Sequence, residues 1–316
     1  MLLKLRYKTL FFTLTRMDSA AAQLTTPQTI GIRDRLSAFV ELTKPRIAFM
    51  LVLTAAAGFY VGNRGTFDIA LFANAMIGIA LLAFGVATLN QWLETRTDAL
   101  MERTANRPLP SGKVSNTEAL IFGSLLCIGA EAYLYFLVNP LTALLGISVI
   151  VGYVLLYTPL KTRTTASTAI GAIPGAMPPL MGWTASANEI TLGAWALFTF
   201  LFLWQFPHFL AIAWMYKDQY EKAGILMLPV VEPSGRITAR QIVLFAIMMV
   251  PVSLAPFFLG FAGWIFLIVA SVLGLWFLIE SIKAARAKTP QMARRLLLVS
   301  VLYLPVIFAV MVLDKR

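Results

Sequence analysis

The sequence Leu81-Leu-Ala-Phe-Gly-Val-Ala-Thr-Leu-Asn90-Gln-Trp-Leu-Glu94-Thr-Arg-Thr-Asp98 is the end of a long apolar run that becomes polar in its last part. Residues four apart lie on one face of an α-helix, so Asn90, Glu94 and Asp98 are predicted to form a stripe of oxygen donors roughly 12 Å long. Basic residues surround or follow this stripe: Arg96, Arg103, Arg107 and Lys113. Oxygen ligands beside cations suit a magnesium-bridged polyphosphate.

The composition is that of a membrane protein. The 316 residues are 59% hydrophobic and 13% charged, with a mean hydropathy of +0.78, whereas about a quarter of the residues of a soluble domain are charged. A span needs about 20 apolar residues. On that basis we predict an all-α polytopic protein with nine spans, at residues 45–62, 69–93, 118–138, 141–158, 167–184, 191–212, 241–261, 263–280 and 294–313. Residues 1–40 are predicted to be a cytoplasmic N-terminal tail, and residues 41–316 the transmembrane domain.

The basic residues predict the orientation. If the N-terminus is cytoplasmic, all but three of the 26 lysines and arginines lie on the cytoplasmic side; the exceptions are Arg64, Lys315 and Arg316. This asymmetry follows the positive-inside rule. The net charge of +11 is then explained by topology, and no nucleic-acid partner is expected. The predicted location is a bacterial inner membrane with the C-terminus on the opposite side, and the basic N-terminus keeps a mitochondrial inner membrane as the alternative.

Single copies of cysteine and histidine limit the possible sites. Cys127 has no second cysteine with which to form an intramolecular disulfide, and a Cys/His zinc site is excluded because His208 is the only histidine. Any metal must therefore be held by oxygen ligands. His208 itself has two interpretations: a packing residue at the membrane boundary, or a nitrogen ligand for an iron porphyrin.

Two further segments on the predicted cytoplasmic side carry charges. Asp218 and Glu221 follow the sixth predicted span at i,i+3 spacing, so two carboxylate clusters could face one cavity and hold Mg²⁺ with a diphosphate. Lys161 ends the segment Tyr157-Thr-Pro-Leu-Lys161 and, with Arg103 and Arg107, could offset the charge of a diphosphate leaving group. Taken singly, the acids also fit solvated helix ends, and the cations fit the positive-inside rule.

The fifth predicted span contains three prolines, Pro174, Pro178 and Pro179, and three glycines between Gly171 and Trp183. We expect this composition to interrupt the helix. Broken backbone inside a membrane is tolerated where it is buried in protein or lines a cavity. The segment is therefore predicted to line a central cavity, with a packing kink as the alternative.

Several motifs occur in the order Leu42-Thr-Lys44-Pro45-Arg46, the Asn90–Asp98 stripe, Met101-Glu-Arg103-Thr-Ala-Asn106-Arg107-Pro108-Leu109, Tyr157-Thr-Pro-Leu-Lys161, Gly171–Trp183, Gln205-Phe-Pro-His208-Phe and Ala223-Gly-Ile-Leu-Met-Leu-Pro229. Over roughly residues 40–313 the chain resembles the haem-farnesylating members of the UbiA prenyltransferase superfamily. It departs from them at Arg96, where many have another acid. The departure leaves fewer metal ligands, and Arg96 is expected to meet phosphate instead.

The resemblance implies a helical bundle around a central cavity open to the cytoplasm. It also implies transfer of the farnesyl group of farnesyl diphosphate to a vinyl group of haem b, with hydration, to give haem O. The implied cofactor is Mg²⁺, held by Asn90, Glu94, Asp98, Asp218 and Glu221. The implied diphosphate ligands are Lys44, Arg46, Arg103, Arg107 and Lys161. Tyr157 is expected to stabilise the allylic cation and His208 to contact haem, and the expected partners are the two substrates, the lipid bilayer and a haem A synthase.

Two other functions remain open. A prenyltransferase of the same superfamily that acts on an aromatic quinone precursor would keep the acidic clusters but has no use for the motif around His208. A membrane transporter would be expected to show inverted repeats and functional charges near the middle of the membrane. In this sequence the acids gather at one predicted membrane face.

Overall fold

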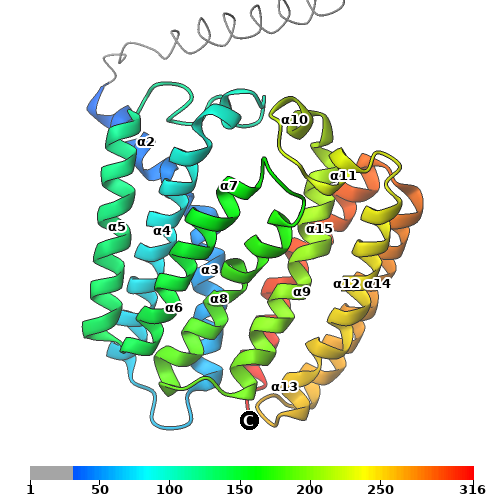
Figure 1. Ribbon diagram of the computed structural model, residues 1–316. Helices are drawn as coiled ribbons and strands as arrows, with labels where there is room; N and C mark the ends of the chain where they lie inside the picture. The colour runs from blue at the N-terminus through cyan, green and yellow to red at the C-terminus, as the bar shows by residue number, and fades with distance from the viewer. Residues whose placement is uncertain (1–30) are drawn as a thin grey trace, which may run out of the picture.

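The computed structural model describes residues 31–316, which form a bundle of long helices; the β pairing in this range is one isolated bridge between Ala262 and Lys315 (Figure 1). The prediction of an all-α membrane bundle is confirmed. Most of the predicted N-terminal tail lies outside the described residues. Its last part belongs to helix α2 (Ile32–Leu42), which packs on the bundle through Ala38 and Leu42.

The long helices are α3 (Pro45–Gly62), α4 (Ile69–Ala99), α5 (Asn116–Leu137), α6 (Pro140–Ile150) with its π-helical continuation η1 (Val151–Tyr157) and α7 (Thr158–Leu160), α8 (Ser167–Ala187), α9 (Leu192–Met215), α12 (Arg236–Ser253), α14 (Trp264–Ala287) and α15 (Pro290–Leu313). Short helices are α10 (Lys217–Lys222), α11 (Leu228–Val231) and α13 (Ala255–Phe258). Within the described residues, 8 segments are long and apolar enough to cross a membrane. Eight of the nine predicted spans correspond to these segments. The remaining predicted span, residues 167–184, corresponds to α8, which is not one of the eight.

Turn chemistry explains where several helices begin. Asn139 caps α6, because its side chain accepts a hydrogen bond from the backbone of Thr142 at 2.8 Å and Pro140 follows at the first helical position. Ser115 and Glu118 form a reciprocal capping box at the start of α5. Because α5 ends at Leu137 and α6 begins at Pro140, the hairpin between them is tight.

The expected interruption of the fifth span is wrong, because α8 is one continuous helix with three prolines inside it. Close packing holds this helix in place: a Cβ added at Gly182 would lie 1.9 Å from the carbonyl oxygen of Ala55 on α3. Neighbouring helices can compensate for the backbone hydrogen bonds that prolines remove inside a membrane bundle. The irregular backbone occurs instead in η1, where no cluster of prolines and glycines predicted it.

The helices form a closed ring. The first long helix, α3, packs against the last, α15. Lys315 Nζ, just beyond α15, donates hydrogen bonds to the carbonyl oxygens of Tyr60 and Asn63 at 2.7 and 2.6 Å. Helices α2, α7, α10 and α11 gather at one end of the bundle with the loop after α4, and the C-terminus lies at the other end (Figure 1). Both acidic segments are therefore at the end opposite the C-terminus.

Candidate active site

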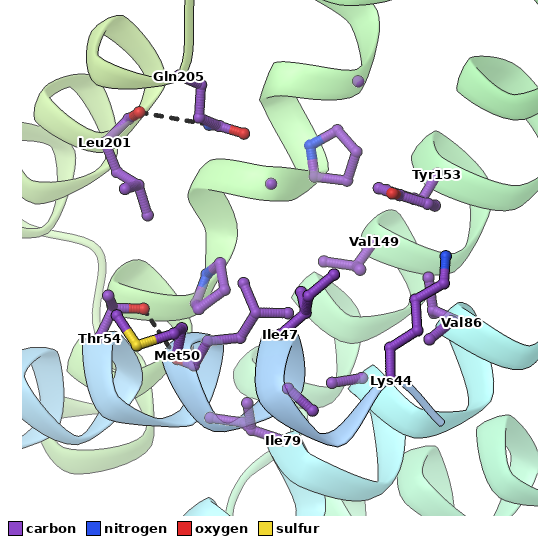
Figure 2. Close-up of a pocket in the computed structure, with 18 of the residues that line it drawn as sticks. Lys44, Ile47, Met50, Thr54, Ile79, Val86, Val149, Tyr153, Leu201 and Gln205 are labelled. Carbon is purple, nitrogen blue, oxygen red and sulfur yellow. Dashed lines mark hydrogen bonds between the residues drawn. The ribbon is translucent and has the colours of Figure 1, made fainter. Parts of the chain in front are cut away.

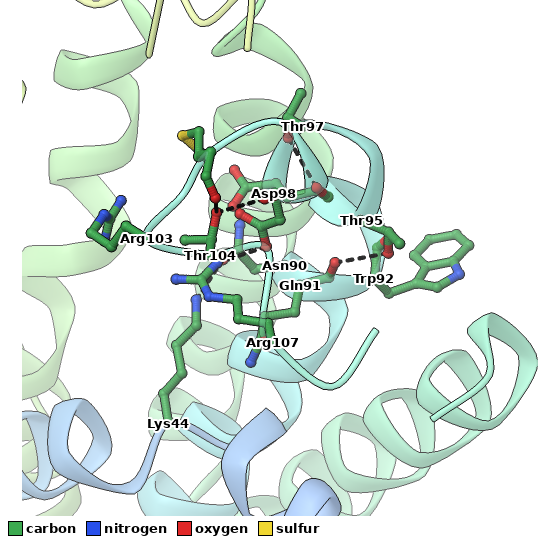
Figure 3. A network of polar contacts seen from close by, with 12 residues as sticks. Lys44, Asn90, Gln91, Trp92, Thr95, Thr97, Asp98, Arg103, Thr104 and Arg107 are labelled. Atoms are coloured by element: carbon green, nitrogen blue, oxygen red, sulfur yellow. Dashed lines mark hydrogen bonds and ion pairs between the residues drawn. The ribbon is translucent and has the colours of Figure 1, made fainter. Parts of the chain in front are cut away.

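The oxygen stripe lies on α4 as predicted, and each of its members contacts one cation; Figure 3 shows Asn90 and Asp98 with Lys44 and Arg107. The three contacts are Lys44 Nζ to Asn90 Oδ1 at 2.8 Å, Lys161 Nζ to Glu94 Oε1 at 2.5 Å and Arg107 Nη1 to Asp98 Oδ2 at 2.7 Å. Only 1% of the Asp98 side chain and 12% of the Glu94 side chain are exposed. The stripe is therefore a row of oxygen donors that are already engaged by cations.

The three cations come from three separate elements. Lys44 lies in the left-handed region (φ 48°, ψ 59°) at the turn between α2 and α3. Lys161 follows α7, and its carbonyl oxygen accepts a hydrogen bond from the backbone of Leu226 at 2.8 Å. Arg107 belongs to the loop after α4, which folds back on the helix end because Thr104 Oγ1 donates to the Asp98 carbonyl oxygen at 2.8 Å. Distant parts of the chain thus assemble one site.

Burial and neighbouring charges shift the pKa values of Lys44 and Lys161 in opposite directions. Burial, together with the nearby Arg107 charge, lowers the pKa of Lys44 from its ordinary value to about 7. Burial by itself would also lower the pKa of Lys161, but the Glu94 carboxylate beside it raises that pKa well above its ordinary value. Lys161 is therefore a permanent cation, whereas the charge of Lys44 depends on its surroundings.

Thr158 orients the amide of Asn90. Asn90 Nδ2 donates to Thr158 Oγ1 at 3.1 Å, and Thr158 Oγ1 donates to the carbonyl oxygen of Tyr153 at 2.8 Å. Because its amide nitrogen is engaged in this way, Asn90 presents its oxygen to Lys44. Thr158 belongs to the motif Tyr157-Thr-Pro-Leu-Lys161, but no site role is predicted for it from the sequence. Its place between Tyr157 and Lys161 was the one available signal.

Two tyrosines of η1 stand between the stripe and the interior of the bundle. The rings of Tyr153 and Tyr157 meet edge to face with centroids 4.9 Å apart, and Lys161 Nζ lies 4.3 Å from the Tyr157 ring centroid. Gly171 on α8 leaves room for this ring, since a Cβ there would lie 2.5 Å from it. Tyr157 is a predicted site residue, whereas Tyr153 is not predicted from the sequence. The π-helical turn that brings the two together has no sequence signal.

The second acidic cluster is close in the fold but arranged differently. Asp218 and Glu221 lie on α10 with exposed side chains, and neither forms an ion pair with any residue in the range 31–316. Across this range, no three His, Cys, Asp or Glu side chains form a group that could hold a metal ion. The structure thus brings the two clusters to the same end of the bundle without joining them.

Arg103 connects the two regions. Its backbone nitrogen donates to Gln219 Oε1 at 3.2 Å, and its guanidinium lies over the ring of Tyr216, 4.9 Å from the centroid. Two further cations predicted to bind phosphate, Arg46 and Arg96, are exposed. Arg46 lines the cavity described next, while Arg96 lies in the last turn of α4.

A cavity of about 470 Å³ lies inside the ring, with a predominantly apolar lining from α3, α4, α6, η1, α8, α9 and α15. Figure 2 shows Lys44 and Tyr153 on one side of it and Gln205 on the other, with Ile47 and Ile79 among the apolar residues between them. The predicted role of the fifth span as a cavity wall is confirmed, since five residues of α8 line this space: Gly171, Pro174, Gly175, Pro178 and Met181. Polar groups thus meet an apolar chamber at the end that carries the stripe.

His208 lines the same cavity from α9. Its Nδ1 lies 2.7 Å from Ser300 Oγ on α15, and its ring stacks on Trp204 with centroids 4.6 Å apart. His208 is about two helical turns, roughly 10 Å, before the end of α9 at Met215. The cavity therefore joins a charged end and a histidine-bearing wall, an arrangement that suits one anionic and one apolar reactant.

Comparison with known proteins gives consistent results. Residues 51–304 match the UbiA prenyltransferase family. The chain is similar to a protoheme IX farnesyltransferase of Solibacter usitatus, with 48% identity over 88% of this chain and 98% of that protein. It is similar to another protein of that name from Koribacter versatilis, with 43% identity over 95% of this chain and 99% of that protein.

Solved structures with the same fold include a digeranylgeranylglyceryl phosphate synthase, with a TM-score of 0.75 and 16% identity over 89% of this chain and 98% of that one. A UbiA homologue from Archaeoglobus fulgidus, bound to GPP and Mg²⁺, has a TM-score of 0.62 and 16% identity over 87% of this chain and 99% of that one. At this level of identity the likeness concerns the fold alone.

Proposed function

Because the chain belongs to the UbiA prenyltransferase family, we propose that it transfers the farnesyl group of farnesyl diphosphate to a vinyl group of haem b and, with addition of water, forms haem O. The observation that carries this proposal is the row of cation-bound oxygens at the charged end of an apolar cavity. Relatives with 48% and 43% identity over most of the chain bear the name protoheme IX farnesyltransferase, which favours haem over a quinone precursor as the acceptor.

The diphosphate binds at the cations of the stripe. Lys161 and Arg107, each bound to a carboxylate, and Lys44, bound to an amide oxygen, can exchange these partners for phosphate oxygens. Arg103 and Arg46 extend the positive region toward α10 and toward the cavity. In this exchange the cations hold the diphosphate, and the oxygens of the stripe become free to bind metal.

The donor set fits Mg²⁺, because the stripe presents oxygen ligands and Mg²⁺ is usually bound by a few carboxylates together with substrate phosphates. Asn90, Glu94 and Asp98 would hold it from α4, with Asp218 and Glu221 contributing from α10. When bound, the ion supplies positive charge to the diphosphate. The Archaeoglobus homologue bound to GPP and Mg²⁺ supports the same pairing of ion and prenyl diphosphate.

The chemistry requires charge to move from the allylic carbon to the leaving group. The allylic C–O bond breaks and its electron pair leaves with the diphosphate, whose charge Lys161 and Arg107 offset. The rings of Tyr157 and Tyr153 stabilise the allylic cation by cation–π contact. The vinyl group of haem b then forms the new C–C bond. Water adds to the resulting porphyrin-side cation and loses one proton, which leaves a hydroxyethylfarnesyl side chain.

The apolar lining serves both substrates. The farnesyl tail and the porphyrin partition into lipid, and the walls of α3, α8 and α9 keep bulk water from the allylic cation until the acceptor reacts. His208 is the proposed haem contact in this wall. The proposed setting is a bacterial inner membrane with the charged end in the cytoplasm, and docking to a haem A synthase stays a prediction.

The test is direct. Purified protein in detergent is incubated with haem b, farnesyl diphosphate and Mg²⁺, and the porphyrin products are identified by mass spectrometry. We expect farnesylated, hydrated haem, and no product when a chelator removes the metal. Turnover of 4-hydroxybenzoate without any haem product would replace haem by a quinone precursor as the acceptor.

A further inference from the structure

The hydrogen-bond partners of Ser300 decide where the proton of His208 lies. Ser300 Oγ is 2.6 Å from the carbonyl oxygen of Leu297 and 2.7 Å from His208 Nδ1. A serine hydroxyl has one hydrogen to donate, and a carbonyl oxygen can only accept. The hydroxyl therefore donates to Leu297, and its lone pair accepts the hydrogen of His208 Nδ1. In the neutral ring this leaves Nε2 without a hydrogen, as a lone-pair donor.

Other contacts fix the plane of the ring. Trp204 stacks on His208 with an interplanar angle of 22°, and Trp204 Nε1 donates to the carbonyl oxygen of Ser300 at 3.2 Å. Ser300 is fully buried on α15, so the ring is held between two helices. The imidazole cannot turn away without breaking contacts on both of them. A histidine prepared in this way resembles metal-binding histidines, whose second nitrogen is usually held by a hydrogen bond.

The other ring nitrogen remains available. In the part of the chain that the structure describes, Nε2 of His208 forms no hydrogen bond. It is not one of the polar atoms that are sealed from solvent without a partner, so it keeps accessible surface. His208 lines the cavity, whose lining from α9 and α15 also includes the apolar residues Phe209, Ile212, Val301 and Leu304. A packing histidine would be expected to have both nitrogens satisfied or sealed from the cavity. This arrangement is suited to a ligand that brings its own electrophilic centre.

We infer that His208 Nε2 is the axial ligand of the haem iron, and that Ser300 is a positioning residue that holds His208 in the required tautomer. The inference rests on the proposed function, which supplies an iron porphyrin as the acceptor. Neutral imidazole is a common axial ligand of haem iron. Iron ligation at this wall anchors the macrocycle by its centre and leaves its edge, which carries the vinyl groups, free to approach the charged end of the cavity.

The experiment compares ferrous haem b with metal-free protoporphyrin IX as probes of the full-length protein in detergent, without farnesyl diphosphate. The two probes share shape and propionates, but only haem has a metal to ligate. We expect Ser300→Ala to bind haem about tenfold more weakly, and His208→Ala to lose more. Both variants should bind metal-free protoporphyrin IX as the wild type does. Added imidazole should restore the haem absorption spectrum of His208→Ala.

Ser253→Ala is the matched control, because Ser253 is also buried and its hydroxyl also donates to a carbonyl oxygen three residues earlier, at 2.6 Å, but among the described residues it forms no hydrogen bond with His208. It should bind both probes normally. If Ser300→Ala or His208→Ala weakens both probes equally, the residues act only in packing and the inference is overturned. Unchanged haem binding in either variant overturns it too. If the wild type binds neither probe, the haem acceptor itself is wrong and the proposed function fails with it.

Discussion

The two acidic clusters look alike in the sequence and differ in the structure. Each follows an apolar span and places carboxylates on one helix face, at Glu94 and Asp98 on α4 and at Asp218 and Glu221 on α10. The first pair is shielded from solvent and bound to cations, whereas the second is exposed and forms no ion pair among residues 31–316. One half of the proposed metal site is thus assembled without substrate, and the other half is not.

Their surroundings explain the difference. The end of α4 is enclosed by the turn at Lys44, by Lys161 after α7 and by the folded loop that carries Arg107. Helix α10 has six residues and none of them is buried. A buried carboxylate requires a partner, because removing a charge from water is costly. An exposed carboxylate does not, so Asp218 and Glu221 can remain in water until a metal ion binds.

Asp98→Asn should have the largest effect on this comparison. It removes a buried negative charge from the proposed metal site, so kcat for haem O formation should fall about 100-fold or more. Mass-spectrometric turnover assays with a thermal unfolding curve in the same detergent would measure both activity and stability. Glu102→Gln is the control, because Glu102 is an exposed acid in the adjacent loop, and it should retain wild-type activity.

Asp98→Asn also leaves Arg107 without its ion-pair partner, so this variant should lose stability as well as activity. Breaking a buried ion pair destabilises a protein by about 3 kcal/mol or more, although Arg107 is 23% exposed and the cost here should be smaller. The double variant Asp98→Asn/Arg107→Gln removes the unpaired charge. It should recover stability and remain inactive. Recovery of activity in the double variant would make the pair structural and remove Asp98 from the metal site.

Lys161→Gln should have the next largest effect. The variant loses a charge-assisted hydrogen bond to the diphosphate, so the KM for farnesyl diphosphate should rise about tenfold. Steady-state kinetics at saturating haem would measure it. Arg163→Gln changes an exposed cation two residues away and should raise the KM less. Equal effects of the two variants would mean that the local positive charge matters and a direct hydrogen bond from Lys161 to the diphosphate does not.

Asp218→Asn tests the exposed half of the site. If Asp218 contributes to the metal only after substrate binds, the Mg²⁺ concentration for half-maximal activity should rise roughly tenfold. The free energy of unfolding should change by less than about 0.5 kcal/mol, since the side chain has no ion-pair partner to lose in the described residues. Glu189→Gln, an exposed acid elsewhere in the chain, should change neither quantity. An unaltered Mg²⁺ titration for Asp218→Asn would remove Asp218 from the proposed metal site.

Gln219→Ala should have the smallest effect. Gln219 Oε1 accepts the backbone hydrogen of Arg103 and so ties α10 to the loop after α4. Loss of one exposed hydrogen bond should lower kcat/KM by about twofold to threefold. The same assay applied to Asp218→Asn/Gln219→Ala would show whether the effects add. Additive losses would mean that the tether does not position Asp218.

Local patterns made much of the fold predictable. The apolar runs correspond to helices close to the predicted spans, and the four-residue spacing correctly placed the stripe on one face of α4. The contacts between the stripe and its cations could not be predicted, because Lys44 and Lys161 are 46 and 67 residues along the chain from their partners, Asn90 and Glu94. The continuity of α8 was also missed, because packing against α3 overrides the tendency of proline to break a helix.

The placement of α15 beside α3 has a consequence for biosynthesis. One wall of the cavity comes from α15, through Val301 and Leu304, and this helix leaves the ribosome after every other long helix in the described range. The chamber therefore cannot close while the chain is still being made, even though α3, α4 and their charged side chains have already emerged. A partly synthesised chain exposes the chamber to lipid, so maturation into a haem-competent protein depends on the final helix and on the lysine that ties it to α3.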